Sequence, residues 1–385
     1  MKRSLLTAFV LSAFALVAGL PAHANWQETL DKARGQSVSF NAWGGDPRIN
    51  SYIAWIGRQV KERYDITLDH VKLSDAATAV GQVLAEQKAG RDVGGSIDLI
   101  WINGENFASM KQRGLLYGPF AQDLPNFALL DTKAMPTILT DFTLPTQGYE
   151  SPWGAAQLNF IYDSAMVPDF ANSSLELLDW TVKNPGLFTY PMPPNFMGST
   201  FLKQVLLELH PDAPALNAPP TDEMFAKFGA PLWDYLEALH PNLWRKGKYF
   251  PQSGPHQRQL LEDSEIAVMI SFTPTESLAL IKEGLLPETV RATGFSGGTI
   301  GNTHFVAIPY NASAKEAAQV VANFMLSVEA QTQKQDIDVW GDASVLPAFL
   351  LPKETPKVDL GPTLSEPHPG WMERLETEWI KRYGN

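Results

Sequence analysis

The sequence predicts an α/β protein of two lobes, with a strand that crosses from one lobe to the other. Three observations support this. Residues 38–114 alternate between strand-like and helix-like segments, a strand-like stretch at 151–162 divides the chain, and a second alternating region follows it. With 385 residues, 44% of them hydrophobic, the chain can bury two substantial cores.

The amino-terminal residues 1–24 are expected to be a secretory signal peptide. Two basic residues precede an apolar run over 5–20, and Ala22 and Ala24 stand where a signal peptidase reads small residues. The run is short for a membrane span. The chain contains no cysteine, which suits an exported bacterial protein in an oxidising compartment. We therefore expect a periplasmic and monomeric protein.

The composition argues against several classes of function. The formal net charge is −12, and loss of the signal peptide makes it more negative, which disfavours nucleic acid and anionic membranes as partners. It mildly favours a cationic ligand. Without cysteine there are no thiolate metal sites, and the seven histidines show no HExxH spacing. A Walker loop is also missing, so we expect no metal and no cofactor.

The first strand, over 38–41, leads into Trp43, Gly44, Gly45 and Asp46. Asp46, followed by proline, is a typical helix start, and apolar residues then recur at helical spacing. Backbone N–H groups and a large aromatic side chain therefore meet beyond the carboxyl end of a strand, where open parallel sheets bind ligands. The alternative is a glycine turn that only reverses the chain.

A second strand is expected over 66–73, a helix capped by Ser74, and a third strand over 97–102. Polar residues follow the third strand before the next helix: Asn103, Glu105 and Asn106. Right-handed crossovers would bring the carboxyl ends of the first and third strands to one edge. These side chains should then face the same crevice as Asp46, unless they are ordinary helix caps.

Residues 151–162 are expected to be a strand that leaves the first lobe, carrying Trp153, Gln157 and Asn159. The second lobe should contain a strand over 186–190 and a turn that ends at Asn195. A helix over 199–209 would then present Ser199 and Thr200 at its amino end.

A polar turn is again expected after a later strand of the chain. A buried strand over 266–270 ends in a polar turn with Ser271 and Thr273. A glycine-rich loop over 295–302 includes Gly301 and Asn302, and a strand over 303–309 and a helix over 314–326 follow it.

One catalytic motif and one metal-binding motif are rejected. Residues 294–298 match the nucleophile elbow G-x-S-x-G, but a strand follows where the mechanism needs a helix. Residues 336–342 resemble the start of a calcium loop, yet Trp340 occupies a ligand position and Pro347 replaces the terminal glutamate. No catalytic residue is assigned.

The order of these segments resembles the periplasmic substrate-binding proteins of ABC transporters, in the branch that carries polyamines, thiamine and ferric iron. Within this branch the chain is most similar to the YnjB-like proteins, a group linked to thiamine transport. The segments that carry the resemblance are 38–45, 97–102, 151–163, 265–270 and 304–323. The resemblance covers nearly the whole mature chain. It implies a type II periplasmic-binding-protein fold, in which each lobe is a mixed sheet flanked by helices and hinge strands join the lobes. Such a protein closes on its ligand by the hinge and docks on inner-membrane ABC permease subunits.

Two departures narrow this resemblance. Ferric-binding relatives present two adjacent tyrosines, which this chain lacks, and the signal peptide has no lipobox cysteine. The resemblance therefore implies a soluble receptor for an organic solute. We expect residues 25–156 and 306–345 in the first lobe, and 157–305 and 346–385 in the second.

The expected ligand is a small organic cation such as thiamine, a related compound or a polyamine, because aromatic faces with nearby carboxylates suit one. Helix amino ends could instead hold an anion such as a phosphate ester. A different class also remains open, an exported carbohydrate-active hydrolase that uses a pair among Asp46, Glu105, Asp163 and Glu276. The residues expected to contact the ligand are Trp43, Gly44, Gly45, Asp46, Asn103, Glu105, Asn106, Trp153, Gln157, Asn159, Asn195, Ser199, Thr200, Ser271, Thr273, Gly301 and Asn302.

Overall fold

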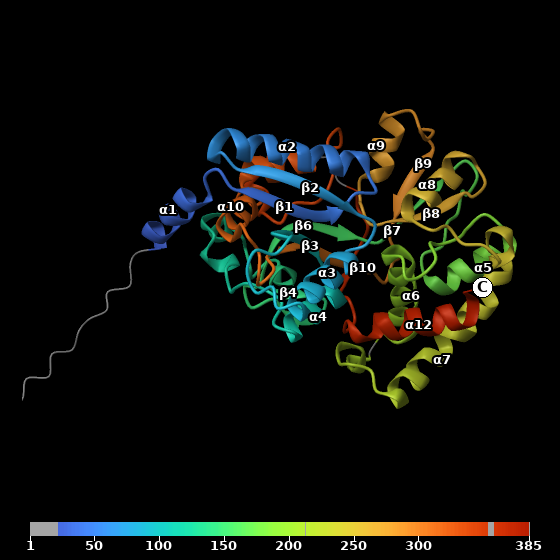
Figure 1. Cartoon of the computed structure of the whole chain (residues 1–385). Helices are drawn as coiled ribbons and strands as arrows, with labels where there is room; N and C mark the ends of the chain where they lie inside the picture. The colour runs from blue at the N-terminus through green and yellow to red at the C-terminus, as the bar shows by residue number, and fades with distance from the viewer. Residues whose placement is uncertain (1–21, 212, 353–357, 385) are drawn as a thin grey trace, which may run out of the picture.

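The computed structural model describes residues 22–211, 213–352 and 358–384, with side chains from residue 26 onward. Most of the predicted signal peptide lies outside this range and stays a prediction. Figure 1 shows two parts side by side, one built on a six-stranded sheet and one on a three-stranded sheet. We call them the first and second lobes. Among the described residues, no helix is long and apolar enough to cross a membrane.

The sheet of the first lobe is mixed, with the strand order β11-β10-β3-β1-β2 and with β6 paired to β10. Strands β1, β2 and β3 are parallel, whereas β10 runs antiparallel to β3 and β6. Its strands are β1 (Ser37–Trp43), β2 (Thr67–Leu73), β3 (Leu99–Ile102), β6 (Glu150–Gln157), β10 (Thr299–Ala307) and β11 (Thr363–Leu364). The predicted β-α-β-α-β order of the first hundred residues is confirmed.

Helices cover the first lobe because each has one apolar face to bury. The longest, α2, buries Ile49, Ile53 and Ile56 against the sheet and α10. The helices are α1 (Ala22–Ala33), α2 (Pro47–Tyr64), α3 (Ala77–Lys88), α4 (Gly104–Gln112), α10 (Lys315–Met325) and α11 (Val328–Gln335). A short hairpin of β4 (Thr140–Asp141) and β5 (Leu144–Pro145) adjoins them. The predicted Ser74 cap is wrong, because α3 begins later and the Asp75 carboxylate accepts the Ala77 N–H at 2.7 Å.

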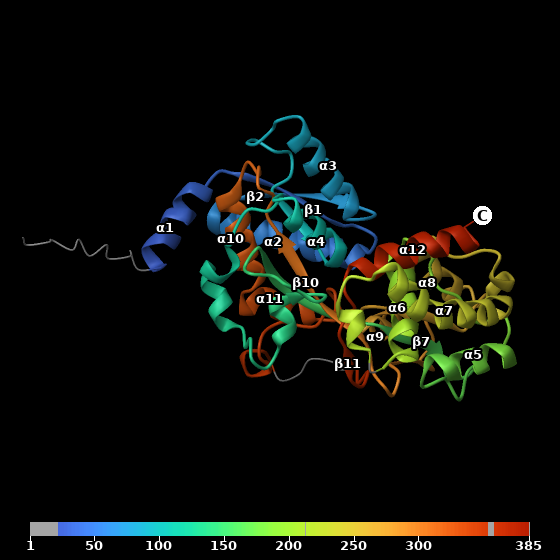
Figure 2. The same ribbon diagram turned by 90° about the horizontal axis from the view of Figure 1, so that it is seen from below.

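The second lobe is built on the antiparallel sheet β8-β7-β9, with β7 (Asn159–Asp163), β8 (Val268–Ser271) and β9 (Val290–Thr293). Its helices are α5 (Ser174–Lys183), α6 (Phe196–Leu209), α7 (Asp222–Leu239), α8 (Gly254–Glu262), α9 (Glu276–Lys282) and α12 (Gly370–Tyr383). The carboxyl-terminal α12 packs on α6 and α7 and also contacts α4 of the first lobe (Figure 2). The predicted strand over 186–190 is wrong, since only a bridge between Phe188 and Val268 forms.

The predicted crossing strand is confirmed, because β6 belongs to one sheet and β7 to the other, with Leu158 between them. The predicted glycine-rich loop over 295–302 is partly wrong. Strand β10 begins at Thr299, so Gly301 and Asn302 lie within a strand. Gly301 is needed there, since a Cβ atom would come within 2.4 Å of the Thr363 side chain on β11. The predicted lobe boundaries stay a prediction.

Candidate ligand-binding site

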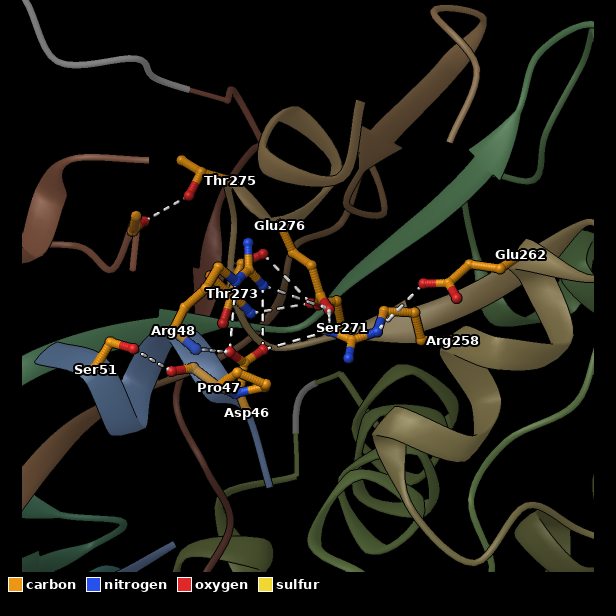
Figure 3. Close-up of polar contacts among 11 residues, drawn as sticks. Asp46, Pro47, Arg48, Ser51, Arg258, Glu262, Ser271, Thr273, Thr275 and Glu276 are labelled. Atoms are coloured by element: carbon orange, nitrogen blue, oxygen red, sulfur yellow. Dashed lines mark hydrogen bonds and ion pairs between the residues drawn. The ribbon is translucent and has the colours of Figure 1, made fainter. Parts of the chain in front are cut away.

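Four charged side chains join the lobes where β1 and β8 end, and we call them the ionic bridge: Asp46, Arg48, Arg258 and Glu276 (Figure 3). Asp46 caps α2 by accepting the Arg48 backbone N–H at 2.7 Å. Its Oδ2 lies 3.2 Å from Arg48 Nη2 and 3.4 Å from Arg258 Nη1 of the second lobe. The same Arg258 atom is 3.4 Å from Glu276 Oε1. The bridge therefore ties a helix start of each lobe to the other lobe.

The bridge is neutral overall, with two carboxylates and two guanidinium groups. Burial alone would raise the pKa of Asp46, but the charge and hydrogen bonds of Arg48, with help from Arg258, hold that pKa below its ordinary value. The Ser271 hydroxyl donates to Glu276 Oε2, and the Thr273 N–H donates to Ser271 Oγ at 3.1 Å. The structure thus brings Asp46, Ser271 and Thr273 together, as the sequence predicted.

Replacing Arg258 with alanine is expected to open the ligand-free lobes. Asp46 and Glu276 would lose the cation that they share across the interface, and a partly buried pair of this kind contributes about 1 kcal/mol. The open population should rise several-fold, which small-angle scattering would detect as a larger radius of gyration. Arg382→Ala is the control, since Arg382 pairs with Glu378 within α12. An unchanged radius in Arg258→Ala would show that the bridge does not hold the lobes.

A second group of side chains, four charged and two aromatic, lies around Lys203 of α6. We call it the lysine cluster: Lys203, Glu105, Glu366, Glu376, Phe142 and Phe196. Lys203 and Glu366 are both 1% exposed, and Nζ lies 2.6 Å from Glu366 Oε2. The same ammonium lies 4.4 Å from the ring centroid of Phe142 and 5.5 Å from that of Phe196. Phe142 and Glu105 belong to the first lobe, and Phe196, Lys203 and Glu376 belong to the second, so this cluster also spans the lobes.

Two carboxyl groups of the lysine cluster lack full neutralisation. Burial raises the pKa of Glu105 to about 7, against partial relief from Lys203 and further repulsion from Glu376 and Asp75. Burial likewise raises the pKa of Glu376 to about 7, although the Ser199 hydroxyl donates to it at 2.6 Å and Lys203 lowers the pKa. The cluster therefore holds more negative charge than its single ammonium offsets.

Phe142 has a strained backbone conformation in this cluster. Phe142 adopts a left-handed conformation with φ of 51°, which a bulky residue rarely adopts. Its ring lies against Gly104, where φ is +57° and a Cβ atom would come within 2.5 Å of the ring. The Gly104 N–H in turn donates to Asp141 Oδ2 at 2.6 Å. Only glycine fits at position 104, so this strained contact holds an aromatic face at the lobe interface.

Three predicted amides lie at or beside the lysine cluster. Asn302 Nδ2 donates to Glu366 at 3.3 Å, and Asn106 Nδ2 donates to Glu105 at 2.9 Å. Asn103 Nδ2 donates to the Thr303 carbonyl at 2.5 Å, which links α4 to β10. These residues orient the carboxylates of the cluster or the strands beneath them.

Several predicted residues lie elsewhere. Trp153 is fully buried in the first core, so the structure does not place it at the candidate site as predicted. Gln157 binds the backbone of Gly361 and Pro362, and Asn159 is buried beneath the Ser271 carbonyl.

The predicted start of α6 is also wrong. Asn195 caps the helix by accepting the Met197 N–H at 3.1 Å, one turn before Ser199. Thr200 is buried within the helix, and its hydroxyl lacks a partner among the described residues.

The glycine turn after β1 is a close-packed turn. A Cβ atom on Gly44 would come within 2.5 Å of Lys72, and one on Gly45 within 2.4 Å of the Trp43 ring. The half-buried Trp43 packs on the first core.

Sequence reasoning missed the cations of the site. Arg48 directly follows the predicted helix start, and Lys203 interrupts an otherwise apolar helix, so both carried a local signal. Arg258 carried none, because its partner Asp46 comes from the other lobe.

Two surface cavities lie away from this interface. One of about 450 Å³ is lined by Trp26, Tyr117 and Phe120, and one of about 390 Å³ by Trp244 and Tyr249. Neither is lined by a predicted site residue. We place the candidate site at the lobe interface because buried charges from both lobes meet there. Among the described side chains, no three acidic or histidine groups are arranged to hold a metal ion.

Two lobes, each with its own sheet, joined by strands that pass from one to the other, define a type II periplasmic binding protein. Solved structures of that class share the fold. AfuA of Actinobacillus pleuropneumoniae, with exogenous fructose-6-phosphate bound, aligns with a TM-score of 0.65 at 15% identity, over 91% of this chain and 99% of that one. The spermidine/putrescine-binding protein PotD of Streptococcus pneumoniae aligns at 0.63 and 17%, over 91% and 100%. A periplasmic thiamin binding protein aligns at 0.62 and 13%, over 90% and 95%.

Residues 55–359 match the family of bacterial extracellular solute-binding proteins. The chain belongs to this family. It is 47% identical to the protein YnjB of Escherichia coli (strain K12) over 383 residues, which cover 97% of each chain. The predicted resemblance is therefore confirmed, and so is the predicted fold class.

Proposed function

We propose that this protein is the periplasmic receptor of an ABC importer and that it binds an organic cation, in the class of thiamine and the polyamines, between its lobes. It would then deliver this ligand to membrane permease subunits. The observation that carries the proposal is the lysine cluster, where Glu366 contacts one ammonium beside two aromatic rings, and Glu105 and Glu376 interact with it through their charge. A ligand cation would supply the missing positive charge and face the rings, where a desolvated cation gains about 2 kcal/mol.

Two similarities support the ligand class. PotD is described as a spermidine/putrescine-binding protein and another structural neighbour as a thiamin binding protein. A phosphate ester would be the alternative suggested by AfuA. The ionic bridge has no net positive charge to attract one, because Arg48 and Arg258 are already paired with carboxylates. The same pairing makes Asp46 and Glu276 poor candidates for the acid of a glycoside hydrolase.

The identity of the ligand can be tested by native mass spectrometry of protein purified without refolding, followed by calorimetry with thiamine, spermidine and glucose. We expect one organic cation to bind in a 1:1 complex, and glucose not to bind. Binding of glucose alone, of a bare metal ion alone, or steady hydrolysis of a glycoside would overturn the proposal.

Cation binding is expected to strengthen as the pH rises towards 7. The carboxyl groups of Glu105 and Glu376 have pKa values of about 7 without ligand, against an ordinary value of 4.5, so both carry protons in mild acid. A cation must displace these protons. The affinity should therefore fall as the pH drops from 7 to 5, by up to about tenfold per pH unit for each proton released, and should be nearly constant above pH 8.

The protons can be counted by calorimetry at pH 6 in two buffers of different ionisation enthalpy. The stability of the unliganded protein should change with pH in the opposite direction to the affinity, and fall as the pH rises. Because the folded pKa values are raised, their ionisation destabilises the fold, and that penalty is absent below pH 4.5 and complete above about 7. Cation binding without proton release at pH 6 would show that these two carboxyl groups do not face the ligand.

A further inference from the structure

Lys203 is placed unusually for a lysine. It lies in the middle of α6 with Phe201, Leu202, Val205 and Leu206 buried around it, and its side chain is only 1% exposed. Lysine side chains normally extend so that the ammonium group reaches water, and a buried lysine needs strong compensation. In this protein most of the compensation for burying the ammonium comes from charge and aromatic rings, and not from directed hydrogen bonds.

The Lys203 ammonium makes no hydrogen bond of normal geometry with any described residue. Its nitrogen is 2.6 Å from Glu366 Oε2, yet neither atom has a partner at an acceptable hydrogen-bond angle. The faces of Phe142 and Phe196 complete its surroundings at 4.4 and 5.5 Å. Charge and aromatic faces without directed hydrogen bonds are what proteins use for organic cations such as quaternary ammonium ions.

This cage assembles only when the lobes are together. Phe142 comes from the hairpin of the first lobe, whereas Phe196 and Lys203 lie on α6 of the second. Glu105 of the first lobe and Glu376 of the second also act on the ammonium through their charge. Lys203 therefore makes, between the lobes, the contacts that a bound cation would make.

We propose that the Lys203 ammonium is a tethered stand-in for the cationic group of the ligand. It occupies the cage of Phe142, Phe196 and Glu366 when the lobes close without ligand, and an incoming organic cation competes with it for that cage. This inference rests on the proposed function for its biological meaning, since it names the part of the site that receives the positive charge. It makes Lys203 a residue that sets how tightly an organic cation binds.

The first test uses Lys203→Ala and tetramethylammonium chloride. The variant should be less stable to heat, because Glu366 would be left buried and unpaired. Tetramethylammonium should restore part of the lost melting temperature in the variant and have little effect on the parent, with sodium chloride at equal ionic strength as the salt control.

Lys334→Ala is the matched control. Lys334 is also fully buried beside a carboxylate, Asp342, but hydrogen bonds to the Trp153 and Ala343 carbonyls hold it within the first lobe. It should not be rescued by tetramethylammonium. Equal rescue of both variants, or no rescue of Lys203→Ala, would overturn the inference.

The second test is calorimetry of Lys203→Met, which keeps the length of the side chain and removes its charge. With thiamine or spermidine, whichever the parent binds, the affinity should rise about tenfold or more, because the internal competitor is gone. A fall of tenfold or more would show that Lys203 binds the ligand directly, and would overturn the inference. This variant also answers the question if Lys203→Ala fails to fold.

The two proposals fail in different ways. If neither parent nor Lys203→Met binds a solute cation, while tetramethylammonium rescues Lys203→Ala, the proposed ligand class is wrong and the cation cage stands. If the parent binds thiamine or spermidine but rescue is absent, the stand-in role is wrong and the ligand class stands.

Discussion

The double variant Glu105→Gln, Glu376→Gln is expected to bind the organic cation at least about 100-fold more weakly than the parent at pH 8. Both carboxylates are ionised at that pH, and both lie at the lobe interface beside the Lys203 ammonium. A hydrogen bond or ion pair to a charged group contributes about 1.5–3 kcal/mol, so the loss of two should exceed two powers of ten. Calorimetry with thiamine and spermidine measures this.

The same double variant should unfold at a higher temperature than the parent at pH 8 when no ligand is present. It no longer carries the two buried charges whose loss of solvation raises both pKa values to about 7. The control is Glu62→Gln, Glu223→Gln, which removes the same charge from two exposed positions. If the affinity of the interface variant is unchanged while its stability is raised as expected, the ligand does not bind at the lysine cluster.

Replacing Trp153 with alanine is expected to lower the free energy of unfolding by about 3–5 kcal/mol, the range for a large aromatic side chain removed from a core. Its ring is fully buried and packs against Trp101 at 4.9 Å, Trp340 at 5.3 Å and Phe40 at 6.3 Å between centroids. Chemical denaturation measures the loss. The affinity of the folded fraction for ligand should stay within about twofold, since the ring does not reach the lobe interface.

Trp43→Ala is the comparison for Trp153→Ala. Trp43 is half-buried at the end of β1 and packs on the edge of the same core, so it should cost much less stability. If Trp153→Ala proved as mild as Trp43→Ala, the aromatic core would be looser than the packing indicates. If it abolished binding while remaining folded, Trp153 would belong to the site after all.

The sequence predicted the elements whose signals are local. The helix cap at Asp46 and the apolar face of α2 are both indicated by residues a few positions apart. The alternation of strands and helices in the first lobe is likewise visible along the chain. The passage from β6 to β7 was also visible, as one strand-like stretch predicted to leave the first lobe. Each of these depends on spacing along the chain and not on what the distant chain does.

The errors have tertiary causes. Trp153 was assigned to the site because aromatic faces suit a cation, but every residue from Glu150 to Gly154 is buried, so neither face of β6 there is open to solvent. Gly301 looked like part of a loop, whereas it is the point where β11 comes close to β10. The pairing of Arg258 with Asp46 depends on how the lobes meet, and spacing along the chain does not encode that.

The positions of β10 and α10 in the sequence determine when the first lobe can be completed during synthesis. The sheet of the first lobe begins at β1, but its strand β10 is complete only at residue 307. Likewise, Tyr52 donates to the Ala330 carbonyl at 2.8 Å across a separation of 278 residues. Most of the second lobe lies between these segments. Its sheet and its helices from α5 to α9 are therefore synthesised before β10, but its α12 emerges last. Both lobes thus wait for partners distant in sequence, and such contacts make for slow folding.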